Sequence, residues 1–179
     1  WRGSVIAGGE LKVKGNELLK NTGLLEGGQK LIINANSLKN SGLLNSSKEV
    51  VYSLTQGVSD RSQDYIKVEN KGTISAGDKV TIDLWHDPAI DKWYVVDNDG
   101  YVIGKTLSIN SGSLENKGGI YSDFFNIKLK DSFSIKKGIV SVANLFKLSG
   151  GSLSIGDKNL GSPFLPSENH LPESKDFLG

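Results

Sequence analysis

The side chains best suited to chemistry gather in one short stretch, near 83–95, where aromatic rings, an imidazole and carboxylates are close in sequence. Aromatic rings that project from a surface can contact a ligand by stacking or anchor a protein partner. A second stretch, near 53–66, adds a further ring and a guanidinium group. The pattern predicts a ligand-binding surface made by Trp85, His86, Asp87, Trp93 and Tyr94, with Tyr65 and Arg61 beside them. These rings could instead pack as a small core beneath the loops, and that alternative stays open.

The same residues do not favour catalysis or a metal site. The chain has 2 histidines, His86 and His170, too few for a histidine metal site and without the sequence context of a triad. The string Asp97-Asn98-Asp99-Gly100 resembles the start of a calcium loop, but Thr106 stands where the closing glutamate belongs. We therefore predict no catalytic residue, no metal ligand and no cofactor.

Composition narrows the range of partners. Lys and Arg total 21 against 20 for Asp and Glu, so a net charge of +1 gives no argument for nucleic acid or an anionic membrane surface. An apolar run of about 18 residues is absent, so we expect no membrane insertion by these residues. Without cysteine the chain has no disulfide or thiolate site. Because methionine is absent even at position 1, we expect these residues to be a piece of a longer protein.

A repeat organises the chain around an Asn-x-Gly motif and its degenerate copies. The glycines of this motif stand at positions 3, 23, 42, 72, 100, 118 and 138, which gives spacings of 20, 19, 30, 28, 18 and 20. A basic period near 20 therefore runs through the chain, and two repeats are longer by about ten residues. Such a period indicates a solenoid, in which each unit packs only on its neighbours.

Aliphatic residues hold fixed places in each repeat. Two positions after the glycines come Val5, Leu25, Leu44, Ile74, Val102, Ile120 and Val140. A second column comprises Leu11, Leu31, Val50, Val80, Leu107, Ile127 and Phe146, and a third comprises Val13, Ile33, Tyr52, Ile82, Ile109, Leu129 and Leu148. A fourth, two positions before the asparagines, comprises Leu19, Leu38, Val68, Val96 and Leu114. The separation of two between the second and third columns is strand alternation, so each repeat predicts three short strands with one face turned inward.

Stacked coils of three strands predict an all-β fold, a right-handed parallel β-helix of about seven coils with two inserted loops and an irregular C-terminal tail. The handedness follows the general chirality of parallel connections. Glycine and asparagine in the turns suggest left-handed backbone conformations. The asparagines Asn21, Asn40, Asn70, Asn98 and Asn116 should also stack into a side-chain amide ladder.

The column spacings also locate the insertions. Residues near 53–66 and 83–95 are additional to the repeat and leave consecutive coils at the same edge, so their roots should lie about one strand spacing apart. We expect residues 1–156 to form the β-helix and residues 157–179, which hold 3 of the 4 prolines, to form a cap or linker.

The repeats resemble those of the filamentous haemagglutinin family, for example in Asn40-Ser41-Gly42-Leu43-Leu44 and Gly72-Thr73-Ile74-Ser75-Ala76-Gly77-Asp78. The resemblance covers roughly residues 1–156. This family comprises exoproteins of two-partner secretion, among them adhesins, haemolysins and the stalks of contact-dependent inhibition toxins. It implies secretion through an outer-membrane partner and display on the surface of a Gram-negative bacterium.

The expected function is a structural and binding segment of a secreted, surface-displayed, adhesin-like filament. Its partner would be a receptor or glycan on a host or neighbouring cell. One alternative is the stalk of a contact-dependent inhibition toxin-delivery protein. Another is a polysaccharide-degrading enzyme, because parallel β-helices also support lyases and hydrolases that use clustered carboxylates. We expect no enzymatic activity in these residues.

Overall fold

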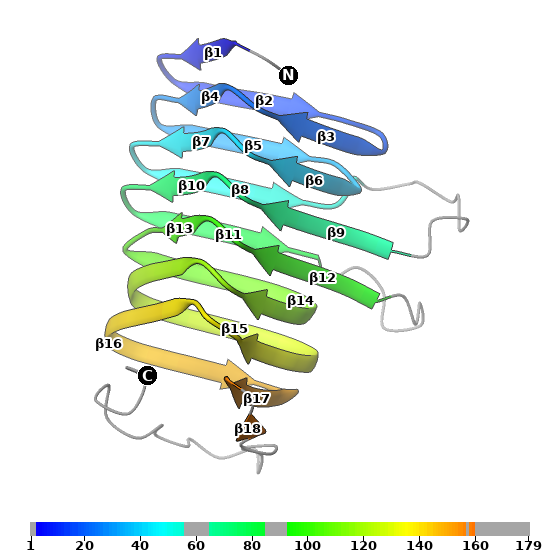
Figure 1. The fold of residues 1–179 in the computed structure, drawn as a ribbon. Helices are drawn as coiled ribbons and strands as arrows, with labels where there is room; N and C mark the ends of the chain where they lie inside the picture. The colour runs from blue at the N-terminus through cyan, green and yellow to red at the C-terminus, as the bar shows by residue number, and fades with distance from the viewer. Residues whose placement is uncertain (1–2, 56–64, 85–92, 157, 160–179) are drawn as a thin grey trace.

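The computed structural model describes residues 3–55, 65–84, 93–156 and 158–159, and of residues 65, 93, 158 and 159 it describes only the backbone. These parts of the chain contain strands and turns and hold no helix that could cross a membrane. Figure 1 shows the chain winding as a stack of coils from the N-terminus to the C-terminus. We number the coils 1 to 7, each beginning at one of the turn glycines 3, 23, 42, 72, 100, 118 and 138.

Three faces surround the axis of the stack. The first face contains β1 (Ser4–Ala7), β4 (Leu24–Gly27), β7 (Leu43–Ser46), β10 (Thr73–Ala76) and β13 (Tyr101–Ile103). The second face contains β2 (Glu10–Lys14), β5 (Lys30–Asn34), β8 (Glu49–Ser53) and β11 (Lys79–Asp83). The third face contains β3 (Leu18–Asn21), β6 (Ser37–Asn40), β9 (Tyr65–Asn70), β12 (Trp93–Asn98) and β17 (Ser152–Ile155).

In the last coils, longer strands bend from one face to the next. They are β14 (Thr106–Asn116), β15 (Gly119–Ile135) and β16 (Ile139–Ser149). All pairings between successive described coils are parallel, for example β4 with β7, β5 with β8 and β12 with β14. The predicted parallel β-helix is therefore confirmed, while its right-handed sense stays a prediction.

The core lies inside the stack, where the predicted columns meet in register. In the first column Leu25 pairs with Leu44, Leu44 with Ile74, and Ile74 with Val102. These four side chains are at most 3% exposed, as expected for inward positions of stacked strands. The first and fourth columns are confirmed, and the fourth continues beyond its predicted end to Phe133 and Leu153.

In coil 6 the predicted register of the second and third columns is wrong by two residues. Phe125 rather than Ile127 pairs with Leu107, and Ile127 rather than Leu129 pairs with Ile109. The cause is local, because the chain turns from the first to the second face within β15, where the register with β16 shifts between Ser122 and Phe124. Irregularities of this kind change which residues face inward.

The predicted reason for the turn glycines is also wrong. In the described residues a positive φ occurs only at Gly3, Gly150, Gly151 and Gly156, so the remaining motif glycines and the asparagines are not left-handed. The motif glycines are needed because successive turns approach each other closely. A Cβ on Gly72 would collide with the carbonyl oxygen of Gly42, and one on Gly100 with that of Gly72.

The amide ladder is confirmed. Asn21 Nδ2 donates to Asn40 Oδ1 (2.9 Å), and the chain continues from Asn40 to Asn70 (2.8 Å), from Asn70 to Asn98 (2.8 Å) and from Asn98 to Asn116 (2.7 Å). The five side chains are at most 2% exposed. Because buried amides are costly unless hydrogen-bonded, this continuous ladder fixes the register of the coils.

At the C-terminal end the parallel stacking stops. The last parallel pair joins Ile135 to Ile155, and β18 (Lys158–Asn159) then returns antiparallel to β17. Within the described residues the parallel stacking therefore reaches Ile155, and the domain boundary at residue 156 stays a prediction. The role of residues 160–179 as a cap or linker falls outside the described residues and stays a prediction.

Candidate functional site

Both insertions leave the scaffold at the same edge. Ser53, which precedes the first insertion, pairs with Asp83, which precedes the second. Tyr65 and Trp93, where the chain returns, pair in the same way. The predicted juxtaposition is confirmed for the roots, which belong to adjacent strands of coils 3 and 4.

The scaffold holds these roots firmly. Asn34 Nδ2 donates to Ser53 Oγ (2.7 Å), and Thr55 Oγ1 donates to the Gly15 carbonyl oxygen (2.8 Å). Leu84, at the start of the second insertion, is fully buried, and its backbone N–H donates to the Asn110 carbonyl oxygen (2.8 Å). Segments anchored in this way have fixed ends, which is how binding loops are positioned on rigid scaffolds.

The predicted ligand-binding residues have different outcomes. Trp85, His86, Asp87 and Arg61 lie outside the described residues, and the side chains of Tyr65 and Trp93 are not described, so their roles stay predictions. Tyr94 needs a correction, because its side chain is 9% exposed and belongs to the hydrophobic core. It is paired with Ile66 and lies two residues before the buried Val96, so strand alternation turns its ring inward, away from a ligand.

A row of ion pairs crosses the third face beside the insertion roots. Lys67, on β9, contacts Glu69 (3.0 Å) and Asp97 (3.1 Å). Lys117 contacts Glu115 (2.9 Å). The ion-pair row comprises Lys39, Glu69, Lys67, Asp97, Lys117, Glu115 and Lys136. Because both signs alternate, this face is not a strip of one charge and does not by itself favour a polyanionic ligand.

The ion pairs shift the pKa values of their members in opposite directions. A hydrogen bond from Lys67 is the main cause that lowers the pKa of Glu69, and one from Lys117 does the same for Glu115. The bond to Glu115 raises the pKa of Lys117. Burial lowers the pKa of Lys67, but its bonds to Glu69 and Asp97 outweigh that effect and raise it overall.

These shifts predict how stability depends on pH. A glutamate whose pKa is lowered by folding stabilises the fold above its ordinary value of 4.5, and this contribution disappears as the pH falls through the lowered value. The lysines keep their contribution until the pH rises above 10.5. We expect thermal stability to decrease below about pH 4.5, by less than about 1 kcal/mol for each pair because the pairs are partly exposed.

The variant Glu69→Gln with Glu115→Gln should lose less stability than the parent between about pH 6 and pH 3, because these carboxylates no longer titrate. Thermal melts at a series of pH values measure the effect. A control with Glu17→Gln and Asp78→Asn changes two exposed carboxylates outside the ion-pair row. If the melting temperatures of both double variants depend on pH in the same way, the ion-pair row does not cause the loss of stability at low pH.

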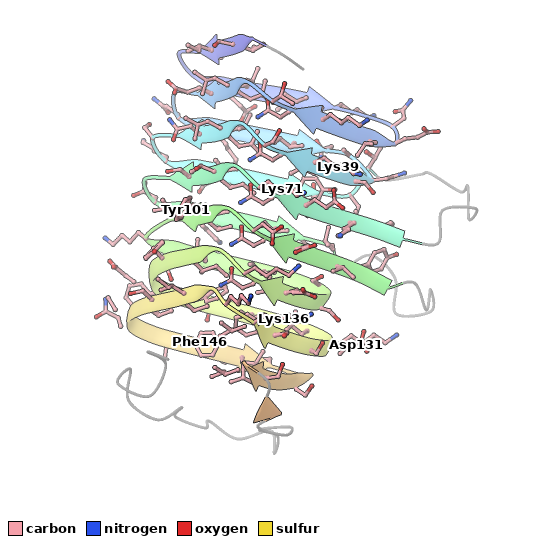
Figure 2. All side chains as sticks on the ribbon, in the orientation of Figure 1. Lys39, Lys71, Tyr101, Asp131, Lys136 and Phe146 are labelled. Carbon is pink, nitrogen blue, oxygen red and sulfur yellow. The ribbon has the colours of Figure 1, made fainter. Side chains whose placement is uncertain are left out.

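Sequence reasoning missed a group of aromatic and aliphatic side chains on the outside of the first face. Tyr101 is 52% exposed, Ile103 39% and Ile139 49%, and Tyr121 lies between them. Figure 2 shows Tyr101 on the outer surface of the stack, beside the turns that begin the coils. The columns already contained the signal, since residues next to inward positions must point outward.

The fold defines the class of protein as a β-solenoid. Comparisons with family models, with curated proteins and with solved structures gave no match.

Proposed function

We propose that these residues form a structural and binding segment of a secreted, surface-displayed, adhesin-like filament. The observation that carries the proposal is the in-register exit of two insertions from adjacent coils of a continuous solenoid. Ser53 pairs with Asp83 and Tyr65 pairs with Trp93, so both insertions begin and end side by side. The resemblance of the repeats to filamentous haemagglutinins supports secretion and surface display.

The physical logic is that of a stiff rod that presents loops. Each coil is bound to the next by backbone hydrogen bonds and by the buried columns, and the amide ladder also joins coils 1 to 5. The scaffold can therefore hold the loops at a distance from a surface. The partner would be a receptor or glycan on a host or neighbouring cell, contacted by Trp85 and Trp93 and by the polar groups around them. The stalk of a toxin-delivery protein would use the same rod, and its toxin domain would lie outside these residues.

The connection in coil 2 provides a template for removing both insertions without changing the register of the strands. Coil 2 has the short connection Ala35-Asn36 at the same edge, between Asn34, which pairs with Ser53, and Ser37. Replacing residues 54–66 by Ala-Asn would give coil 3 this connection. Replacing residues 84–94 by Ala-Asn would do the same for coil 4, because Val95 pairs with Lys67.

Binding of the labelled chain to cultured epithelial cells, to Gram-negative bacteria and to a glycan array tests the proposal. We expect the parent chain to bind and the variant without insertions to bind at least about tenfold more weakly, a difference of about 1.4 kcal/mol. Circular dichroism and thermal melts check that the variant keeps the β-helix. Undiminished binding by the folded variant, or no binding by the parent chain to any of these surfaces, would contradict the proposal.

A further inference from the structure

Exposed apolar side chains concentrate at one end of the solenoid. Among the described residues the exposed large hydrophobic side chains outside coil 1 all belong to coils 5 to 7. Register places Tyr101 next to Gly119, Gly119 next to Ile139, and Ile103 next to Tyr121. We call this group the first-face patch; it comprises Tyr101, Ile103, Tyr121 and Ile139, with Phe124 and Leu145 at the adjoining corner.

The two tyrosines of the patch fill the space that Gly119 leaves open. A Cβ on Gly119 would lie 2.8 Å from Tyr101 Cδ1 and 2.5 Å from Tyr121 Cε2, so both rings extend over the glycine. Their centroids are 6.4 Å apart and their planes are inclined by 25°. The rings therefore cover the middle of the face and make it a continuous apolar surface.

The patch lies in a face without formal charge. From coil 4 to coil 7 the outward positions of the first face are Thr73, Ser75, Tyr101, Ile103, Gly119, Tyr121, Ile139 and Ser141. In contrast, the third face of the same coils carries the part of the ion-pair row from Asp97 to Lys136. Charged residues stand at the turns that border the first face, such as Asp99 and Lys117 on one side and Lys105 and Asp123 on the other. An apolar aromatic centre with a charged rim is typical of a protein–protein interface.

We infer that two copies of this chain pair laterally through the first faces of coils 4 to 7. In a two-fold symmetric pair the same patch meets itself, so a charged residue close to the symmetry axis faces its own copy, and a patch without charges avoids this repulsion. This face meets that condition. Two β-sheet faces can also pack at about 10 Å with interdigitating side chains. Exposed leucine and isoleucine beside the tyrosines favour such an apolar partner over a hydroxyl-rich glycan.

The size of the patch predicts a weak pair. Stable interfaces bury about 1,200–2,000 Å² in total, and a few half-exposed side chains per copy fall at or below the low end of that range. We therefore expect dimers that dissociate on dilution. Lateral pairing is independent of the proposed binding by the insertions, because the first face and the insertion edge, between the second and third faces, are different parts of each coil.

Sedimentation velocity of the full chain over a concentration series up to about 1 mM tests the inference. We expect a monomer at low concentration and an increasing dimer fraction as the concentration rises. The variant Tyr101→Lys with Ile139→Lys places like charges opposite each other across the two-fold axis and should weaken the dimer at least about tenfold. Both positions are exposed, so the variant should keep its circular dichroism spectrum and melting temperature.

The control Ser134→Lys adds a charge to the third face of coil 6 and should leave dimerisation unchanged. The variant without insertions should also still dimerise, which separates this inference from the proposed function. A monomer at every concentration, or equal dimerisation of the lysine variant and the parent, would overturn the inference. Dimerisation seen only after removal of residues 160–179 would overturn it too, because those residues would then cover the patch.

Discussion

Replacing Ile74 by aspartate should unfold most of the described coils. Ile74 is 2% exposed and lies between Leu44 and Val102 in the first column. A carboxylate in this place has no partner, and an unpaired buried charge is among the most destabilising changes a core can receive. We expect a loss of about 4 kcal/mol or more, comparable to the whole stability of many domains. Because each coil packs only on its neighbours, a break in coil 4 separates the two halves of the stack.

Circular dichroism and urea unfolding at low protein concentration measure this effect. The matched control is Ser75→Asp, because Ser75 is the next residue on β10 and points outward. We expect this control to change stability by less than about 1 kcal/mol. Equal destabilisation by the two substitutions would show that the inward column is assigned wrongly.

Replacing Asn70 by alanine should also destabilise the stacked coils strongly. Asn70 is 1% exposed, donates to Asn98 Oδ1 (2.8 Å) and to the Tyr101 carbonyl oxygen (3.0 Å), and accepts from Asn40 Nδ2 (2.8 Å). Alanine breaks the ladder at its centre and leaves buried polar atoms of Asn98 and Tyr101 without this donor. Each buried group left unsatisfied costs about 1–3 kcal/mol, so we expect a total loss of about 3 kcal/mol.

The matched control for the ladder is Asn45→Ala. Asn45 points outward on β7 and its Nδ2 donates to Glu26 Oε2 (3.0 Å), so it loses a hydrogen bond at the surface instead of in the core. We expect a loss below about 1 kcal/mol. Urea unfolding of both variants gives the comparison. A cost at Asn70 no larger than the cost at Asn45 would mean that the ladder does not stabilise the coils.

Coils 1 to 5 could be predicted almost residue by residue because their aliphatic columns recur at nearly constant distances from the motif glycines. Coil 6 could not, because its first and second faces belong to the single strand β15, whose register with β16 shifts between Ser122 and Phe124. The sequence then allows either Phe125 or Ile127 opposite Leu107, because both are apolar and, being two residues apart, both point to the same face of the strand. Packing decides for Phe125, whose ring lies 6.3 Å from that of Phe133 and 5.5 Å from that of Phe146.

Of the candidate site, only the residues next to the inward-facing columns could be predicted from the sequence. The roots of the insertions follow from the spacing between Tyr52 and Val68 and between Ile82 and Val96, and the register bears them out. Val96 points inward, and side chains two residues apart on a strand point to the same face, so Tyr94 must point inward too. Its assignment to a ligand surface did not take this alternation into account. Residues farther into the insertions follow no repeat, so neither periodicity nor stacking fixes the directions of their side chains.

Hydrogen exchange of the asparagine side-chain amides, followed by NMR, tests the central claim of a continuous stacked scaffold most directly. The Nδ2 protons of Asn40, Asn70 and Asn98 are buried in the ladder, so they should exchange only when the coils unfold, at rates similar to the core backbone amides. Those of Asn144, which is exposed, should exchange much faster. If the ladder amides exchange as fast as those of Asn144, the coils are not joined by a buried ladder and the scaffold described here is wrong.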